Sequence, residues 1–452
     1  MSSPKTTRRR FLQSTAAGVA SIPVLGAGSE ASGGSQVSPN DRIRIATVGL
    51  GQQGTSDTRS ALRQPGVELV GVADLYRGRR IRAKEVFGDS ITTTDDYREL
   101  ISRGDVDAVI VATSDHWHAT ICIEAMEAGK DVYCQKPMVH ALPEGHRMIE
   151  CERRTGRILQ VGSQRTSSPL YRKARALLAA GAVGEPILIE AWYHRSSTNG
   201  AWQYVIPPDS SPSTVNWEAF LGKAPARPFD ADRFFRWRNY WDYGTGIPGD
   251  LFVHLLTGVH FITDSPGPNR VTADGGLRYW RDGREVPDLM MGLYRYPETE
   301  THPAFNLSLT VNFADLDQDS GLRIVGSEAI MTLGRSGLTL TKRPRDRDIR
   351  PSIITFPEAM QMELLAAHEE AGEPVTVNEK SESYGSVGGA GGNDAHLATF
   401  LSAVRSRRPA LQDSTFGFRA AAPALLANRS YLEGRAVAWD PVAMEASQEE
   451  SR

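Results

Sequence analysis

Short apolar runs alternate with charged, amphipathic stretches from residue 41 onward. Ile43–Val48, Val67–Ala73 and Ala108–Ala112 are rich in β-branched residues and nearly free of charge, as is typical of strands that are buried on both faces. The same pattern predicts two more strands, Asp131–Cys134 and Ile158–Val161, and five helices, Thr55–Arg63, Arg77–Phe87, Asp95–Ser102, Ala119–Ala128 and Leu142–Arg154. This alternation predicts an α/β domain with a doubly wound parallel sheet over residues 41–163.

A different pattern begins at Gln164. A helix over Tyr171–Ala180 and a strand over Pro186–Tyr193 precede a stretch rich in Trp, Pro and Arg from Trp202 to Tyr243. Strands then recur with few helices between them, at Val271–Gly275, Met290–Tyr296, Ala304–Asn312, Leu322–Val325 and Ala329–Leu333, and two helices close the chain, His396–Ser406 and Phe416–Leu432. We therefore predict a second, α+β domain over residues 164–441 with a largely antiparallel open sheet, and a disordered tail over 442–452.

Residues 1–40 are expected to lie outside both domains. Thr7–Gln13 carries paired arginines followed by Phe and Leu, and a short apolar stretch, Ser14–Ala27, comes next. A basic segment before such a stretch is typical of a signal peptide, and this one resembles the twin-arginine export signal. The alternative is a disordered basic tail. We predict export through the twin-arginine machinery, with a periplasmic or other exported location, and no stable membrane span, because no segment reaches about 18 continuous apolar residues.

Composition narrows the classes of function. The chain has 452 residues, 40% of them hydrophobic, and a net charge of −3 without a one-sided basic excess. This makes a nucleic-acid partner improbable. The three cysteines, Cys122, Cys134 and Cys151, have apolar neighbours and no paired spacing, so we interpret them as buried structural thiols. We predict no metal site, because the chain has no Cys-x-x-Cys or clustered histidine ligands.

A glycine-rich turn follows the first predicted strand. Its sequence is Gly49-Leu50-Gly51-Gln52-Gln53-Gly54. The first glycine permits a tight turn, the second lets a pyrophosphate approach the backbone, and the third allows close packing of helix on strand. The N-terminus of the following helix offers free N–H groups to the phosphates. With Gly49, Gly51, Gln52, Gln53 and Gly54 in this context, we predict a dinucleotide site in a Rossmann domain.

Asp74 ends the second strand, twenty residues after Gly54. An acid at this place is expected to hold the ribose hydroxyls of adenosine and to repel a 2′-phosphate. Arg77, Arg79 and Arg80 lie close by, and one of them could turn toward such a phosphate. NAD is therefore predicted in preference to NADP.

Three further segments follow successive strands, where open α/β sheets bind their ligands. They are Ala112–His118, Cys134–Pro137 and Val161–Arg165. With the glycine turn and Asp250-Leu-Phe-Val-His254, these motifs resemble the glucose–fructose oxidoreductase / inositol dehydrogenase family (Gfo/Idh/MocA) over about residues 42–441. The resemblance implies oxidation of a secondary alcohol on a sugar or cyclitol.

The same resemblance assigns roles to single residues. Lys136, which precedes a proline that fixes the chain, corresponds to the family's lysine at nicotinamide and substrate, although Gln135 stands where relatives usually have Glu. His254 corresponds to the catalytic base, and Asp250 to a residue that orients it or binds a substrate hydroxyl; on a helix the two would share one face. The remaining implied cofactor contacts are Thr113, Ser114, Asp115, His118, Gln135, Lys136 and Gln164. Residues Arg233–Asp242 fit either a core or a sugar pocket.

Two other functions stay open at this point. Some relatives resemble glycoside hydrolases that use NAD transiently in oxidation and elimination, but their His-Gly motif is replaced here by His254-Leu255. A non-catalytic NAD sensor is the second alternative, and Lys136, Asp250 and His254 together disfavour it. We also predict a homo-oligomer, and a cofactor that is loaded before export and held tightly afterwards.

Overall fold

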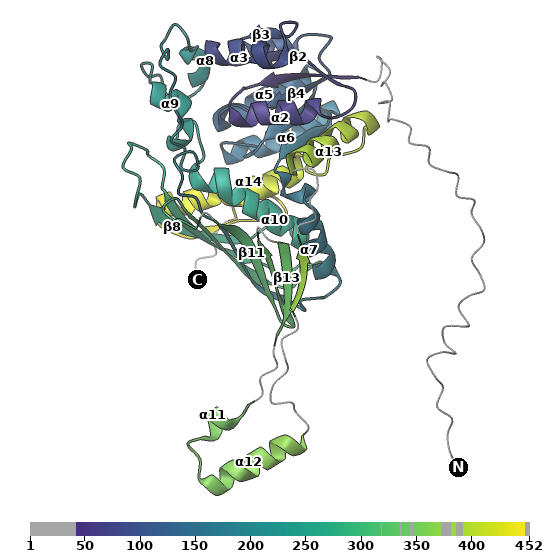
Figure 1. Cartoon of the computed structure of the whole chain (residues 1–452), viewed down its shortest axis with the longest axis vertical. Helices are drawn as coiled ribbons and strands as arrows, with labels where there is room; N and C mark the ends of the chain where they lie inside the picture. The colour runs from purple at the N-terminus through teal and green to yellow at the C-terminus, as the bar shows by residue number, and fades with distance from the viewer. Residues whose placement is uncertain are drawn as a thin grey trace, which may run out of the picture.

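A computed structural model of the chain describes residues 42–317, 319–334, 337–343, 348–371, 381–385 and 392–447. The first 41 residues, including the predicted export signal, lie outside the described residues. In the described part the strands form two sheets, which Figure 1 shows one above the other. This arrangement confirms the predicted fold class.

The upper sheet has six parallel strands in the order β3-β2-β1-β4-β5-β6. Its strands are β1 (Ile43–Val48), β2 (Val67–Ala73), β3 (Thr92–Thr94), β4 (Ala108–Val111), β5 (Asp131–Gln135) and β6 (Leu159–Gly162). Successive residues of β1 pack on opposite faces, with Ile45 in one core cluster and Ala46 in another. Both faces are thus buried, which explains the absence of charged residues at the centre of these strands.

Helices cover both faces of this sheet. They are α2 (Gln52–Leu62), α3 (Arg77–Phe87), α4 (Tyr97–Ile101), α5 (Asp115–Glu127) and α6 (Leu142–Thr155), and α13 (Gly392–Ser406) joins them from the end of the chain. Leu397, Phe400 and Leu401 of α13 pack with Ile45 and Tyr133 in one core cluster. The C-terminal segment therefore returns to the parallel sheet and covers the face that α2 covers.

The lower sheet has nine strands in the order β14-β13-β12-β11-β7-β10-β9-β8-β15, and only the pair β7 and β10 is parallel. Its strands are β7 (Pro186–Tyr193), β8 (Arg270–Gly276), β9 (Leu289–Tyr296), β10 (Phe305–Asn312), β11 (Ser320–Gly326), β12 (Ala329–Gly334), β13 (Gly337–Lys342), β14 (Ser381–Gly385) and β15 (Val437–Ala438). Buried and exposed residues alternate along β9, where Met290 and Tyr294 are buried and Met291 and Leu293 exposed. One face of this sheet packs on the core, and the other faces outward.

The packed face meets α7 (Pro169–Ala179), α10 (Val253–Thr263) and α14 (Ser414–Glu433), and α14 lies between the two sheets (Figure 1). The short helix η2 (Gln164–Ser167) precedes α7. The segment between β7 and α10 holds the shorter elements α8 (Trp217–Leu221), α9 (Ala231–Phe235), η3 (Trp237–Asn239) and the π-helix η4 (Pro248–Phe252). Phe220, Phe234 and Phe235 of this segment pack with Tyr76, which follows β2. The segment thus reaches across to the parallel sheet and closes one side of the space between the domains.

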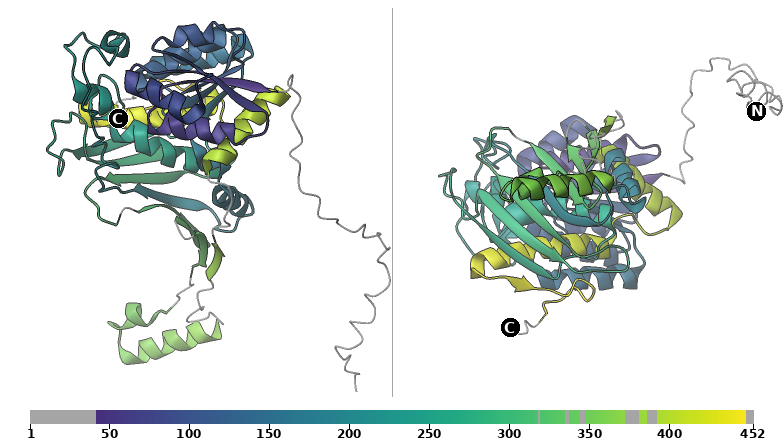
Figure 2. Two further views of the ribbon diagram at one scale, coloured as in Figure 1. Left: turned by 45° about the horizontal axis from the view of Figure 1, so that its top comes forward. Right: turned by 90° about the horizontal axis from the view of Figure 1, so that it is seen from below.

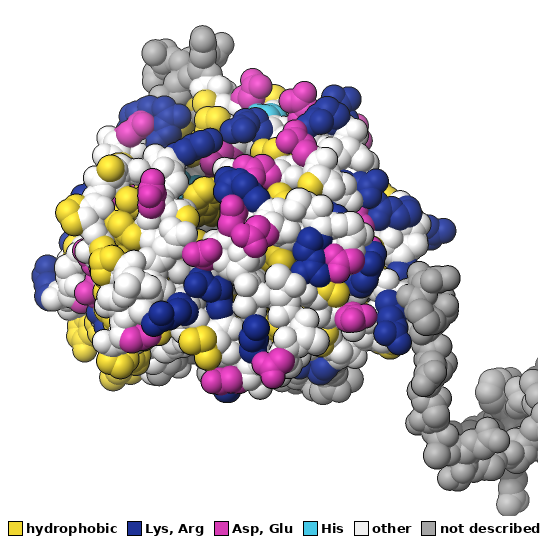
Figure 3. Space-filling model, turned by 90° about the horizontal axis from the view of Figure 1, so that it is seen from above, with side chains coloured by type: hydrophobic (Ala, Val, Ile, Leu, Met, Phe, Trp, Pro, Cys, Tyr) yellow, Lys and Arg dark blue, Asp and Glu magenta, His cyan; other side chains and the backbone are white. Residues whose placement is uncertain are grey.

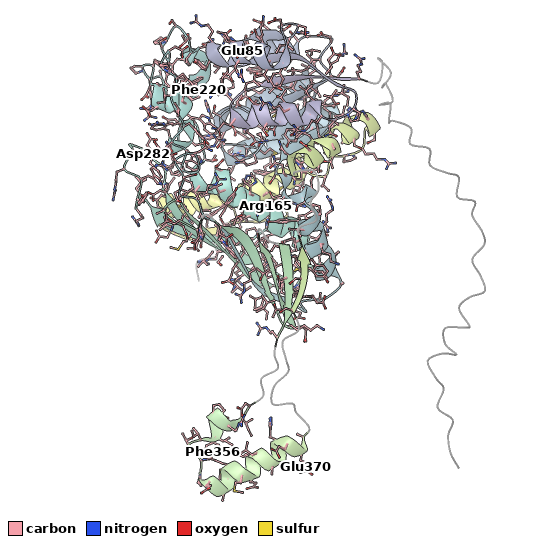
Figure 4. The ribbon with its side chains drawn as sticks, in the orientation of Figure 1. Glu85, Arg165, Phe220, Asp282, Phe356 and Glu370 are labelled. Atoms are coloured by element: carbon pink, nitrogen blue, oxygen red, sulfur yellow. The ribbon has the colours of Figure 1, made fainter. Side chains whose placement is uncertain are left out.

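Two helices that the sequence pattern did not predict, α11 (Arg350–Ile353) and α12 (Glu358–Glu370), stand apart from the two sheets (Figures 1 and 2). Phe356 and Glu370, labelled in Figure 4, both lie on this projection. No residue of α12 is buried, so its apolar side chains have no core to give them the usual one-sided pattern.

The three cysteines are free and buried, which confirms their interpretation as structural thiols. On the face seen in Figure 3, basic and acidic side chains are interspersed. None of the helices in the described ranges has both the length and the apolar character that a membrane crossing requires.

Candidate active site

A cleft of about 1070 Å³ runs along the carboxyl ends of β1, β2, β4 and β5 and continues to α10. Its volume is at the upper end of the range for small-molecule sites, about 300–1000 Å³. Asp74 lines one end, and His254 lines the other. The cleft therefore offers room for an extended ligand and a second, smaller one.

The glycine turn shapes the first part of the cleft. Gly49 has a φ of +88°, and a Cβ there would lie 2.5 Å from the carbonyl oxygen of Ala112. At Gly54 a Cβ would lie 1.9 Å from the carbonyl oxygen of Gly49, so helix α2 can approach the turn only without a side chain. Gly51, which precedes the first residue of α2, has open space where its Cβ would be. These three positions fit a dinucleotide whose phosphates contact the backbone at the N-terminus of α2.

The carboxylate of Asp74 is fixed at the end of β2. It accepts hydrogen bonds from the backbone N–H of Leu50 at 2.7 Å and of Tyr76 at 2.9 Å, and Nη1 of Arg79 lies 3.6 Å away. Only 5% of Asp74 is exposed, but the residue lines the cleft. Asp74 is thus placed to hold a ribose hydroxyl of the adenosine half.

The two glutamines of the turn point in different directions. Gln52 donates a hydrogen bond across the cleft to Asn199 at 3.0 Å, whereas Gln53 donates to Asp57 one turn along α2 at 2.8 Å. Gln52 therefore closes over the phosphate region. Gln53 also lines the cleft, and it connects the cleft to the buried carboxylate of Asp57.

The residues after β4 are engaged with neighbouring backbone and with the other domain. Ser114 precedes the first residue of α5, and Thr113 donates to its carbonyl oxygen at 3.2 Å. The carboxylate of Asp115 accepts from the hydroxyl of Thr245 at 2.6 Å and from the backbone N–H of that residue at 3.0 Å. Asp115 thus joins the two domains, while Thr113 and Ser114 line the cleft.

His118 stabilises the loop that carries Lys136. Its Nδ1 lies 2.7 Å from the carbonyl oxygen of Pro137, and its Nε2 lies 3.3 Å from that of Thr113. Burial lowers the pKa of His118, so the ring is neutral and donates one hydrogen bond, which the shorter distance assigns to Pro137. The side chain lines the cleft.

Gln135 and Gln164 belong to a buried polar cluster around Asp57. Nε2 of Gln135 donates to Asp57 at 2.7 Å, and Asn393 of α13 donates to the same carboxylate at 3.0 Å. Gln164 donates in turn to Asn393 at 3.1 Å. Burial raises the pKa of Asp57 to about 6, against the lowering effect of these hydrogen bonds. The carboxylate of this cluster is therefore on Asp57, and residue 135 contributes an amide that donates to it.

Lys136 forms an ion pair with Asp250 across the domain boundary. Its Nζ lies 2.6 Å from Oδ1 of Asp250 and 2.9 Å from the carbonyl oxygen of the same residue. The side chains are only 11% and 10% exposed. An ammonium group has three N–H donors, and two are used here. The third remains for a ligand in the cleft, which Lys136 lines.

Asp250 accepts hydrogen bonds from two further residues that the sequence analysis did not assign to it. Nε1 of Trp202 lies 3.1 Å from Oδ2, and Nε of Arg238 lies 3.2 Å from Oδ1. Burial alone would raise the pKa of Asp250, but the positive charges of Lys136 and Arg238 hold it well below its ordinary value. Asp250 is thus ionised, and it positions the lysine.

The expected helical pairing of Asp250 with His254 takes a different form. Asp250 lies in the π-helix η4, and His254 lies in the first turn of α10. Both line the cleft, but the hydrogen bonds of Asp250 in the described residues go to Lys136, Trp202 and Arg238 and not to the imidazole. A single π turn at a functional site is a common device for re-aiming side chains.

His254 faces the cleft with its ring packed edge-on against Tyr193, at a centroid separation of 6.4 Å. Burial, followed by the positive charges of Lys136 and Arg165, lowers the pKa of His254 well below 6.5. The imidazole is therefore neutral at physiological pH and can accept a proton.

The stretch Arg233–Asp242, for which a core and a sugar pocket were both open interpretations, contributes residues to a buried cluster and to the lining of the cleft. Phe234, Phe235 and Tyr240 belong to a buried cluster, and Trp237 and Arg238 line the cleft. Trp202 and Asp57 were not singled out from the sequence. An acid on a helix directly after a glycine turn is the one signal that could have indicated Asp57, and no sequence signal pointed to Trp202.

Two family models match the chain in succession. Residues 43–163 match "Oxidoreductase family, NAD-binding Rossmann fold", and residues 172–279 match "Oxidoreductase family, C-terminal alpha/beta domain". Inositol 2-dehydrogenase of Salmonella typhimurium is 30% identical over 158 residues, which cover 34% of this chain and 47% of that protein. The scyllo-inositol 2-dehydrogenase (NAD(+)) of Bacillus subtilis is 34% identical over 147 residues, or 32% of this chain and 43% of that protein. The chain spans about half the length of these curated relatives.

Solved structures share the whole fold. Levoglucosan dehydrogenase in complex with NADH superposes with a TM-score of 0.63 at 16% identity, covering 88% of this chain and 99% of that one. The WlbA dehydrogenase of Bordetella pertussis, in complex with NADH and UDP-GlcNAcA, gives 0.62 at 15% identity, with coverage of 88% and 99%. The solved structures show the shared fold, and the two family models, over residues 43–163 and 172–279, show that the chain belongs to the Gfo/Idh/MocA oxidoreductase family.

Proposed function

We propose that the protein is an NAD-dependent oxidoreductase that acts on a secondary alcohol of a sugar or cyclitol. The observation that carries this proposal is the ion pair of Lys136 and Asp250 beside the neutral His254, at the far end of a cleft shaped for a dinucleotide. Oxidation of a carbinol removes a hydride from carbon and a proton from oxygen. A base and a hydrogen-bond donor at the oxygen are the two groups that this reaction needs.

The residues of the chain divide these tasks. His254 accepts the proton of the substrate hydroxyl, since its lowered pKa leaves the ring unprotonated before the reaction. Lys136 directs its remaining N–H to the same oxygen and stabilises negative charge that develops there. Asp250 holds the ammonium group in place through two contacts. A bound nicotinamide supplies the hydride acceptor.

The dinucleotide is assigned to the glycine turn and Asp74. The description of the matched model as an NAD-binding fold and the NADH in two structural relatives support NAD as the cofactor. The carboxylate of Asp74 occupies the place where a 2′-phosphate would lie and disfavours NADP.

The purified protein tests this proposal directly. We would offer it sugars, cyclitols and nitrophenyl glycosides and follow both the absorbance of reduced nicotinamide and the release of nitrophenol. The proposal predicts reduction of the cofactor without glycoside cleavage, and cleavage without net reduction would contradict it. Lys136→Ala should abolish turnover and retain NAD binding, because the side chain belongs to the far end of the cleft.

The same proposal includes export of the protein and a tightly bound cofactor that is loaded before export. If the chain is exported folded through the twin-arginine machinery, its NAD must be loaded beforehand, since free NAD is not expected outside the cytoplasm. Protein purified from the periplasm should then carry about one nucleotide per chain. Purified exported protein without nucleotide would refute this part. A homo-oligomer stays a prediction, which sedimentation of the purified protein would test.

A further inference from the structure

Four cationic side chains gather at the substrate end of the cleft. Lys136, Arg195 and Arg238 line it, and Arg165 adds its charge to the surroundings of His254. Figure 4 labels Arg165 in the middle of the molecule, between the two sheets. These four cations outnumber the carboxylates that lie near them, Asp250 and Asp115.

Two of the four cations, Lys136 and Arg238, lie in direct contact with a carboxylate. Asp250 lies 2.6 Å from Nζ of Lys136 and 3.2 Å from Nε of Arg238. Asp115 also acts on Arg238 and contributes to its raised pKa, although burial opposes this shift. Lys136 and Arg238 therefore share two carboxylates.

Arg195 and Arg165 lack a direct contact of this kind, although the charge of Arg195 also acts on Asp250. Their guanidinium carbons lie 4.4 Å and 5.5 Å from the ring centroid of Tyr193, at the end of β7, and Arg165 also donates to the hydroxyl of Tyr171. Among the described residues neither arginine forms an ion pair with a carboxylate, and both are half-buried. Among the described side chains, the direct contacts that hold these two positive charges at the substrate end are thus with aromatic rings and a hydroxyl group.

The adenosine end of the same cleft shows the opposite arrangement. Arg79 lies 3.6 Å from Asp74, and Arg98 lies 3.5 Å from Asp96. A half-buried guanidinium group is costly unless an anion or several hydrogen bonds offset its lost hydration. The surplus of charge is therefore specific to the place where the proposed function puts the substrate.

We propose, on the basis of the function proposed above, that the substrate is an acidic sugar whose carboxylate or phosphate group binds Arg195 and Arg165 beside the reacting carbon. Guanidinium groups present parallel N–H donors that match two oxygens of either group. Tyr193 holds both arginines on its ring, so the acid group is recognised next to His254. The site selects against a neutral sugar, which leaves the two charges unpaired.

Sugars that differ only in whether they carry an acid group show how much this group contributes to recognition. We would compare glucose, glucuronate and glucose 6-phosphate by kcat/KM with the NAD-loaded full chain, and by calorimetric binding to the NADH-loaded chain. At least one acid should exceed glucose by about tenfold or more in both measurements. A preference for glucuronate identifies a carboxylate, and a preference for the phosphate identifies a sugar phosphate. The advantage should shrink with rising ionic strength.

Variants test whether Arg195 is the source of the preference. Arg195→Gln should lower the ratio of acidic to neutral sugar about tenfold or more, whereas Arg154→Gln, at an exposed pair with Glu127, should leave the ratio unchanged. Equal binding of glucose and both acids, or an equal loss for all three in Arg195→Gln, would overturn the proposal. Absence of cofactor reduction with every sugar would reject the proposed function instead, and calorimetry would still decide whether the acid group is bound.

Discussion

Replacing Gln135 by glutamate would place two carboxylates against each other inside the parallel-sheet domain. Nε2 of Gln135 now donates to Asp57 at 2.7 Å, and the Oε1 atom lies 3.3 Å from the backbone N–H of Lys136. In Gln135→Glu an oxygen replaces the donor. The residue that most relatives are expected to carry should therefore destabilise this chain whenever both carboxyl groups are ionised.

The size of the stability loss in Gln135→Glu follows from the burial of Asp57. Two unit charges about 4 Å apart repel by roughly 4 kcal/mol at an effective dielectric constant of about 20. The pair can avoid this repulsion by taking up one proton. Because the pKa of Asp57 is already raised to about 6, protonating it costs about 3 kcal/mol at pH 8, at about 1.4 kcal/mol per unit. Uptake of a proton costs less free energy than the repulsion, so we expect the variant to lose about 3 kcal/mol of stability at pH 8.

The pH dependence has a definite sign. The folded variant holds a proton on the acid pair that the unfolded chain, with ordinary carboxyl pKa values near 4, has already released. The folded state binds more protons over this interval, so its stability falls as pH rises from about 4 through the raised pKa of the pair. The variant should be close to the original protein at pH 5 and clearly less stable at pH 8.

The double variant Asp57→Asn/Gln135→Glu provides the matched control. Its amide can donate to the new carboxylate, while the amide oxygen accepts the bonds that Gln53 and Asn393 now give to Asp57. Urea denaturation at pH 5 and pH 8 should show a large loss in the single variant at pH 8 and recovery in the double variant. An equal loss at both pH values, or no recovery, would refute the reasoning.

Three other predictions follow from the cleft. Gly49→Ala should weaken NAD binding at least tenfold in a fluorescence titration, because φ is +88° and the new Cβ would lie 2.5 Å from a carbonyl oxygen; unchanged affinity would contradict the geometry. Trp202→Phe, which removes one hydrogen bond to the ionised Asp250, should lower kcat/KM by about tenfold with little change in NAD affinity. The lowered pKa of His254 predicts that kcat/KM for oxidation stays flat above pH 6.5 and falls only on the acid side, where the imidazole is protonated; a midpoint above pH 7 would exclude it as the base.

The sequence was sufficient to predict those site residues that lie at the carboxyl ends of parallel strands. Carboxyl ends of such strands meet at one edge, so the order of strands and turns already placed Gly49, Asp74 and Lys136 along one cleft. The strand boundaries followed from β-branched runs, and most helix ends differ from the structure by only a few residues.

The substrate half depends on contacts that no local pattern encodes. Trp202 reaches Asp250 from a long irregular segment, with a φ of +64° that is rare for an aromatic residue. The π turn at Pro248–Phe252 changes the direction of Asp250 relative to His254, so a spacing argument based on a regular helix could not assign its partners. Helix α12 was missed because its apolar residues face no core.

Transfer of deuterium from the substrate is the measurement that tests the central claim most directly. The protein would be loaded with NAD and given sugars or cyclitols that carry deuterium at their carbinol carbons, and the nucleotide would then be released and weighed by mass spectrometry. Hydride transfer predicts reduced nucleotide that has gained one deuterium, and none in Lys136→Ala. Reduced nucleotide without deuterium, or the same labelling in the variant, would contradict a hydride-transfer site at Lys136 and His254.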